Sequence, residues 1–84
     1  MDLGYSYVLS ESAAEFAFRL PLREQRRLAG VCRDLVKSPD RAGDYGTLDP
    51  LGRRLQNLLI DDWVITFWAD HATKELRITE IVQV

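Results

Sequence analysis

The sequence has few of the residues that build disulfide-bonded or metal-binding proteins. Its 84 residues include one cysteine and one histidine. A lone cysteine has no partner for an internal disulfide, which fits a reducing cytoplasm. One Cys and one His also give no ligand spacing for a metal ion, and no glycine-rich loop suited to phosphates is present. We therefore expect no metal and no cofactor.

Long apolar runs and an excess of basic charge are absent too. No run approaches the roughly 20 apolar residues that cross a bilayer, and the first residues lack the basic and apolar segments of a signal peptide. We expect no membrane partner. The net charge of −2 also differs from that of a typical nucleic-acid-binding protein, because such proteins are usually basic.

The chain does have the apolar content of one small domain, residues 1–84, with 46% hydrophobic residues. Its last third holds three runs rich in β-branched, aromatic and aliphatic side chains. These are Gly52–Ile60, Trp63–Ala69 and Lys74–Val82, separated by polar turns. The pattern predicts a three-stranded antiparallel meander.

The residues upstream predict a strand and two helices. Tyr5–Leu9 alternates and reads as a first strand. Ser10 and Ser12 are both candidates for the N-cap of a first helix, and Ser12 with Glu15 fits a capping box. Pro21 ends that helix at Leu20.

The second helix is predicted over Leu22–Lys37, and the loop Asp40–Leu51 is expected to be irregular and either functional or mobile. The fold class is therefore α+β. The order is β-α-α-β-β-β, an antiparallel sheet with a helical hairpin packed on one face.

A two-residue turn at Asp61–Asp62 fixes the faces of the sheet, because it pairs Leu58 with Ile65 and successive side chains alternate. The face assigned to the helices carries Leu58, Ile60, Ile65 and Phe67, with Leu76 and Ile78 from the last strand. The open face carries Arg53, Leu55, Asn57, Val64, Thr66, Trp68, Asp70, Arg77 and Thr79. Gln56 falls among the apolar set, which a β-bulge would explain.

With these residues in place, the chain resembles the RelE/ParE superfamily, the toxins of type II toxin–antitoxin systems. The likeness covers nearly the whole chain. It rests on Tyr7–Ser10, Leu35–Pro39, Gly43–Tyr45, Gly52–Arg53, Trp63–Asp70 and Lys74–Ile78. The resemblance implies a small cytoplasmic bacterial toxin, neutralised by a cognate antitoxin. Some members cleave messenger RNA on the ribosome without a metal, and others inhibit DNA gyrase.

The sequence departs from the ribonuclease members at three open-face positions. Leu55, Asn57 and Val64 stand where those members usually carry basic residues. Many members also carry an Arg and a Tyr or His after the last strand, a position that only Gln83 and Val84 occupy in this sequence. Three activities therefore stay open: endoribonuclease, gyrase inhibitor, or non-catalytic interaction module of the same fold. The oligomeric state is not predicted.

The candidate catalytic residues are a histidine with three cations: His71, Arg53, Arg77 and Lys74. Histidine can transfer protons near neutral pH, and Arg or Lys can stabilise charge on a phosphate. The simpler interpretation, which the sequence favours, is an ion pair between Arg53 and Asp70, with His71 and Lys74 as ordinary turn residues.

The candidate partner-binding residues are Trp68, Arg54 and Asp70. Trp68 could stack on an RNA base but is favoured as an antitoxin contact, because Trp is enriched in interfaces. A basic stripe on the second helix is favoured as a solvated face; it comprises Arg23, Arg26, Arg27, Arg33 and Lys37. Cys32 is expected to be a buried, unreactive thiol.

Overall fold

The computed structural model describes residues 4–84, and it contains two helices and a five-stranded sheet. The expectation about a signal peptide falls partly on residues 1–3, outside the described part. The elements are β1 (Ser6–Leu9), α1 (Glu11–Arg19), α2 (Leu22–Leu35), β2 (Tyr45–Leu48), β3 (Arg54–Ile60), β4 (Trp63–Asp70) and β5 (Glu75–Gln83). Neither helix is long and apolar enough to cross a membrane.

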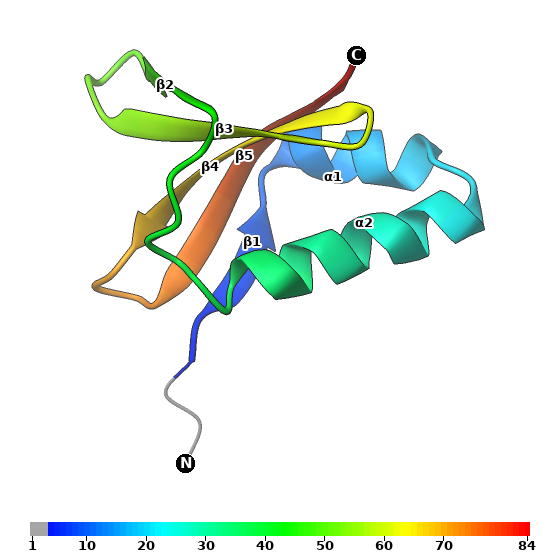
Figure 1. Ribbon diagram of the computed structural model, residues 1–84, viewed down its shortest axis with the longest axis horizontal. Coiled ribbons are helices and arrows are strands. Elements are labelled where there is room, and N and C mark those ends of the chain that lie inside the picture. The colour runs from blue at the N-terminus through cyan, green and yellow to red at the C-terminus, as the bar shows by residue number, and fades with distance from the viewer. Residues whose placement is uncertain (1–3) are drawn as a thin grey trace.

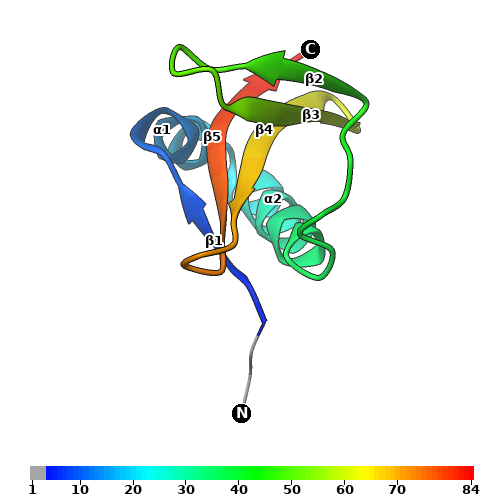
Figure 2. The ribbon, with the colours of Figure 1, turned by 90° about the vertical axis from the view of Figure 1, so that its left-hand side faces the viewer.

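Both helices lie on one side of a twisted sheet whose strand order is β1-β5-β4-β3-β2 (Figures 1 and 2). This confirms the predicted α+β class and the one-sided helical cover. The sheet is mixed rather than wholly antiparallel, because the two helices cross one face and return the chain so that β1 runs parallel to β5. The other three strand pairs are antiparallel.

The strand β2 lies inside the segment Asp40–Leu51 that was expected to be irregular, so that prediction was wrong over Tyr45–Leu48. All four of its residues are exposed, and an edge strand with no buried side chain leaves no apolar alternation in the sequence. Just before β2, the backbone at Gly43 passes close to β3. A Cβ at this position would lie 2.4 Å from the carbonyl oxygen of Asn57, so a residue with a side chain would clash there.

The helix boundaries follow from local chemistry. Ser10, not Ser12, is the N-cap of α1, and its Oγ accepts a hydrogen bond from the backbone N–H of Ala13 at 3.1 Å. The capping box at Ser12 and Glu15 was therefore wrong. Pro21 ends α1 as predicted, and α2 ends at Leu35, two residues before the predicted Lys37.

The core fills the space between the helices and the sheet. Register pairs such as Leu58 with Ile65 are as predicted, and the buried cluster contains Leu58, Ile65, Phe67, Leu76 and Ile78 from the sheet with Ala13, Leu28, Cys32 and Leu35 from the helices. Trp63 is its largest member and has no exposed surface.

Gln56 lies on this face without a bulge in β3. Its Oε1 accepts a hydrogen bond from the N–H of Gly43 at 2.9 Å. The irregular register lies instead between β4 and β5, where Thr66 pairs with Glu80 and Phe67 with Ile78, leaving Thr79 as the extra residue.

Candidate functional site

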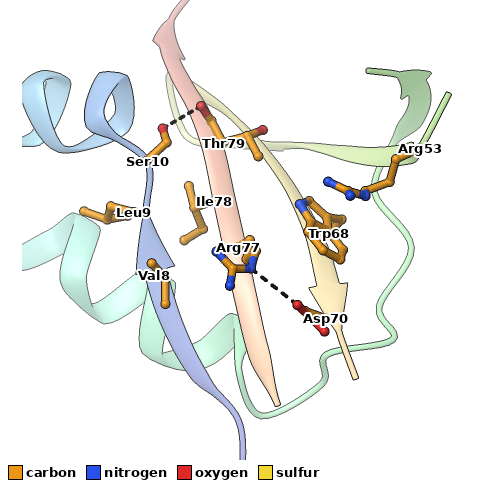
Figure 3. Close-up of a pocket in the computed structure, with 9 residues that line it drawn as sticks. All are labelled: Val8, Leu9, Ser10, Arg53, Trp68, Asp70, Arg77, Ile78 and Thr79. Atoms are coloured by element: carbon orange, nitrogen blue, oxygen red, sulfur yellow. Dashed lines mark hydrogen bonds and ion pairs between the residues drawn. The ribbon is translucent and has the colours of Figure 1, made fainter. Parts of the chain in front are cut away.

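A pocket of about 510 Å³ opens on the face of the sheet that the helices leave bare. Residues of β1, β4 and β5 line it together with Arg53, which directly precedes β3. Figure 3 shows Arg53 reaching toward Trp68, with Arg77 on the neighbouring strand and Asp70 below it. The structure thus brings together Arg53, Trp68 and Arg77, as the strand alternation predicts. We call this the open-face pocket.

Arg53 is positioned by a tight loop at Asp49. The Oδ1 atom of Asp49 accepts hydrogen bonds from the backbone N–H groups of Leu51 and Arg53, at 2.9 and 2.8 Å. Its other carboxylate oxygen lies 3.5 Å from Nη1 of Arg53. The predicted ion pair between Arg53 and Asp70 is therefore not formed, because Asp49 lies close to Arg53 in the loop. Arg53 instead stacks on the Trp68 ring, with Cζ 3.9 Å from the ring centroid.

Arg77 is held by two carboxylates at the two ends of the β4–β5 turn, Asp70 at the end of β4 and Glu75 at the start of β5. Its Nε lies 3.5 Å from Asp70, and its Nη2 donates to Glu75 at 2.8 Å. Partial desolvation acts to raise the pKa of Asp70. Hydrogen bonds from Thr73 and Ala72 and the charge of Arg77 outweigh it, so the pKa of this carboxyl is lowered. Asp70 is therefore ionised at neutral pH.

The open-face pocket presents two guanidinium groups and the face of one indole, against one pocket-lining carboxylate. Arginine offers five N–H donors in a planar fork that matches phosphate. An aromatic ring beside such cations can stack on a planar, electron-poor ring. The site suits a ligand that combines an anionic group with an aromatic one.

The other half of the bare face is closed by its own hydrogen bonds. Asn57 and Thr66 are only 4% and 9% exposed. The Asn57 amide oxygen accepts from the Thr66 hydroxyl at 2.7 Å, and its nitrogen donates to Thr47 Oγ1 at 3.0 Å. The polar groups of Asn57 and Thr66 are therefore satisfied within the protein.

His71 and Arg54 lie elsewhere. His71 does not line the open-face pocket; its Nδ1 bonds the Tyr5 hydroxyl and its Nε2 lies 3.2 Å from Asp40. Arg54 and His71 line another pocket of about 240 Å³ on the helix side of the sheet, and Arg54 also lines a pocket of about 370 Å³ beside β2. Lys74 lies in the β4–β5 turn with a φ of 56°. The predicted catalytic set is thus divided between two sides of the sheet, and Arg54 is separated from Asp70.

Sequence reasoning missed Asp49 and Tyr5, which position Arg53 and His71. The pair Asp49–Pro50 is a turn signal that could have indicated the first, whereas the contact of Tyr5 with a turn 66 residues away has no local signal. Among residues 4–84, no group of three or more His, Cys, Asp or Glu is arranged to hold a metal ion.

The basic stripe of α2 is only partly a solvated face. Arg23, Arg26 and Arg33 are exposed, and Lys37 pairs with Asp34 at 3.4 Å. Arg27 instead binds Glu24 and the β3–β4 turn, so the solvated interpretation was wrong for this residue. Cys32 is buried as predicted, and burial raises the pKa of its thiol to about 11.

Sequence comparison gives no match to any protein-family model. No curated protein is similar at a significant level. Solved structures do match. A chain of the RelBE2 toxin–antitoxin complex from Mycobacterium tuberculosis is 15% identical, with a TM-score of 0.75 over 98% of this chain and 100% of that one.

Chains of two further solved complexes have a similar fold. For the archaeal RelE–RelB complex from Pyrococcus horikoshii the TM-score is 0.72, at 13% identity and 96% coverage of both chains. For the intact E. coli RelBE complex it is 0.71, at 11% identity over 95% of this chain and 96% of that one. Identities this low show the fold alone, and this chain has the RelE fold found in those toxin–antitoxin complexes, as the resemblance implied.

Proposed function

We propose that this chain is the toxin of a toxin–antitoxin pair, held inactive by a cognate antitoxin, and that it acts in the cytoplasm on messenger RNA at the ribosome. The observation that carries the proposal is the alignment of 98% of the chain with 100% of a chain from the RelBE2 complex. Both ends of the alignment are covered, so the likeness extends to the strands that form the open-face pocket.

The chemistry of that pocket supports RNA as the ligand. Arg53 and Arg77 can donate to a phosphate, and a base can stack on the Arg53–Trp68 pair, since a guanidinium plane is also a stacking surface for bases. Arg53 has one carboxylate partner, at 3.5 Å, so most of its donors are available to a ligand. Gyrase inhibition is the second candidate: Trp68 also suits a protein contact, but the two guanidinium groups beside it match a phosphate.

The roles of the remaining candidates differ. We assign Arg53, Trp68 and Arg77 to RNA binding, and we assign Asp70 to positioning Arg77 through their contact at 3.5 Å. Cleavage also needs proton transfer, for which His71 remains the proposed group and Lys74 a proposed phosphate contact. His71 lies beside Arg54, on the other side of the sheet from Arg77.

The test is controlled expression in a bacterial host. We expect growth arrest and fragmented messenger RNA, both abolished by Arg53→Ala with Arg77→Ala and both reversed by the antitoxin encoded next to the gene. Arg23→Ala with Arg26→Ala removes the same charge from exposed positions of α2 and should keep full toxicity.

Three results would contradict the proposal. They are unchanged toxicity of the Arg53 and Arg77 double variant, inhibition of gyrase supercoiling with intact RNA, and the absence of any growth arrest. His71→Ala separates the roles within the proposal: loss of cleavage with retained RNA binding supports proton transfer by this group, and full cleavage removes it from the mechanism.

A further inference from the structure

The sheet divides between β3 and β4 at the end that carries the open-face pocket. Pairing of these strands runs from Ile60 with Trp63 to Gln56 with Phe67 and ends there. Beyond that point Arg54 pairs with Leu48 of β2, whereas Trp68 pairs with Arg77 of β5. Figure 2 shows the start of β3 and the end of β4 diverging into two separate hairpins.

This division connects the two sides of the sheet. Neighbouring residues in an extended strand point to opposite faces, and Arg53 lines the open-face pocket while Arg54 lines the pocket on the helix side. Asp70 and His71 are divided in the same way. Trp68 lines both pockets, so the two are neighbours across the place where the strands separate.

The helix-side pocket is lined by two arginines against one carboxylate, Asp40. Arg41 and Arg54 line it, and neither guanidinium has an ion-pair partner among residues 4–84. The loop carrying Arg41 is tied to β3 through Gly43 and Gln56. It is also tied to the β4–β5 turn through the contact of Asp40 with His71 at 3.2 Å.

We infer that Arg41 and Arg54 form a second phosphate-binding site, which takes the next part of the RNA strand whose first part occupies the open-face pocket. The inference rests on the proposed function and adds a second contact to it. Single-stranded nucleic acid carries one negative charge on every nucleotide, so one strand supplies both sites. Cations that flank an aromatic ring are the usual arrangement for binding such a strand. An acidic protein segment is the competing occupant.

The test compares two lengths of single-stranded RNA by fluorescence anisotropy: a trinucleotide, and an oligonucleotide of about ten nucleotides. The variants are Arg41→Ala with Arg54→Ala for the second site and Arg53→Ala with Arg77→Ala for the first. Arg23→Ala with Arg26→Ala is the matched control, at the opposite end of α2. Circular dichroism checks that each variant is folded.

We expect the second-site variant to bind the longer RNA about tenfold or more weakly, with the trinucleotide affinity changed less than about twofold. For the longer RNA, the slope of log affinity against log salt concentration should become less steep by about 1.4. This is the change expected when two phosphate contacts on a single strand are lost. The first-site variant should lose affinity for both lengths.

The inference is overturned if the second-site variant weakens both RNA lengths equally, or weakens the longer RNA no more than the control does. It is also overturned if RNA binding is unchanged while an acidic peptide of about ten residues loses affinity. If the first-site variant binds both RNAs normally and the second-site variant does not, the proposed function of the open-face pocket fails and the second site stands.

Discussion

Two arginines of this protein stack on tryptophans at the same distance, 3.9 Å from Cζ to the ring centroid, and their surroundings differ. Trp63 is fully buried. Arg27, which covers it, donates to Glu24 at 2.9 Å and to Asp62 at 3.2 Å and also binds Asp61. This stack ties α2 to the β3–β4 turn and has no donors directed to a ligand.

The second stack is on the bare face. Trp68 is only partly buried, and Arg53 has a single carboxylate at 3.5 Å. A guanidinium with one long ion pair keeps most of its donors for water or for a ligand. At the same stacking distance, neighbouring carboxylates and burial therefore decide how many donors an Arg–Trp pair leaves unengaged within the protein.

The largest expected difference between the stacks is in the tryptophans. Trp63→Ala should lower the free energy of unfolding by about 4 kcal/mol, because it removes the largest buried side chain of a small core. Trp68→Ala should cost about 1 kcal/mol or less, while weakening RNA binding about tenfold. Urea unfolding and anisotropy give the two values. Equal losses of stability would remove the distinction between the two stacks.

Replacing the arginines should also destabilise the first stack more than the second, by a smaller amount than replacing the tryptophans. Arg27→Ala should lower the midpoint of thermal unfolding by roughly 5–10 °C, and Arg53→Ala by about 2 °C at most. Arg27→Lys is the matched control, since it keeps the charge and loses the planar fork. An intermediate midpoint is expected for it. Full recovery with Lys would show that charge alone, without stacking on Trp63, holds the turn.

The sequence predicted those parts of the fold that local pattern controls. Asp61–Asp62 fixed the pairing of Leu58 with Ile65, and Pro21 fixed the end of α1. The strand β2 was missed because all its side chains are exposed. Alternation also placed Arg53, Trp68 and Arg77 together correctly, since they lie on regular strands or directly beside one.

The rest of the site depends on contacts between distant segments. His71 was grouped with Arg53, but the division of the sheet beyond Gln56 and the bond to Tyr5 place it on the other side. Arg27 was taken as solvated because its partners Asp61 and Asp62 lie more than thirty residues away. Such contacts leave no periodic signal in the sequence.

The smallest expected difference concerns two carboxylates in acid: Glu24, which binds Arg27 of the first stack, and Asp70, which lines the open-face pocket beside Arg77. The hydrogen bond from Arg27 lowers the pKa of Glu24 below its ordinary value of 4.5. The pKa of Asp70 lies below its ordinary value of 3.8, because bonds from Thr73 and Ala72 and the charge of Arg77 outweigh desolvation. A carboxyl with a lowered pKa stabilises the fold above its unfolded pKa, and this contribution is lost as the pH falls through the folded value.

Glu24→Gln and Asp70→Asn should therefore lower the thermal midpoint at neutral pH, and the difference from the wild type should shrink in acid, as the pH falls through the lowered pKa of the folded wild-type carboxyl. Glu24→Gln should have the larger effect, since Arg27 then keeps only the turn carboxylates, whereas Arg77 without Asp70 keeps Glu75 at 2.8 Å. Midpoints of the three proteins at neutral and at acidic pH decide the order. A larger loss for Asp70→Asn would mean that the carboxylate beside Arg77 stabilises the fold more than the one beside Arg27, and the contrast between the structural Arg27 cluster and the open-face pocket would fail.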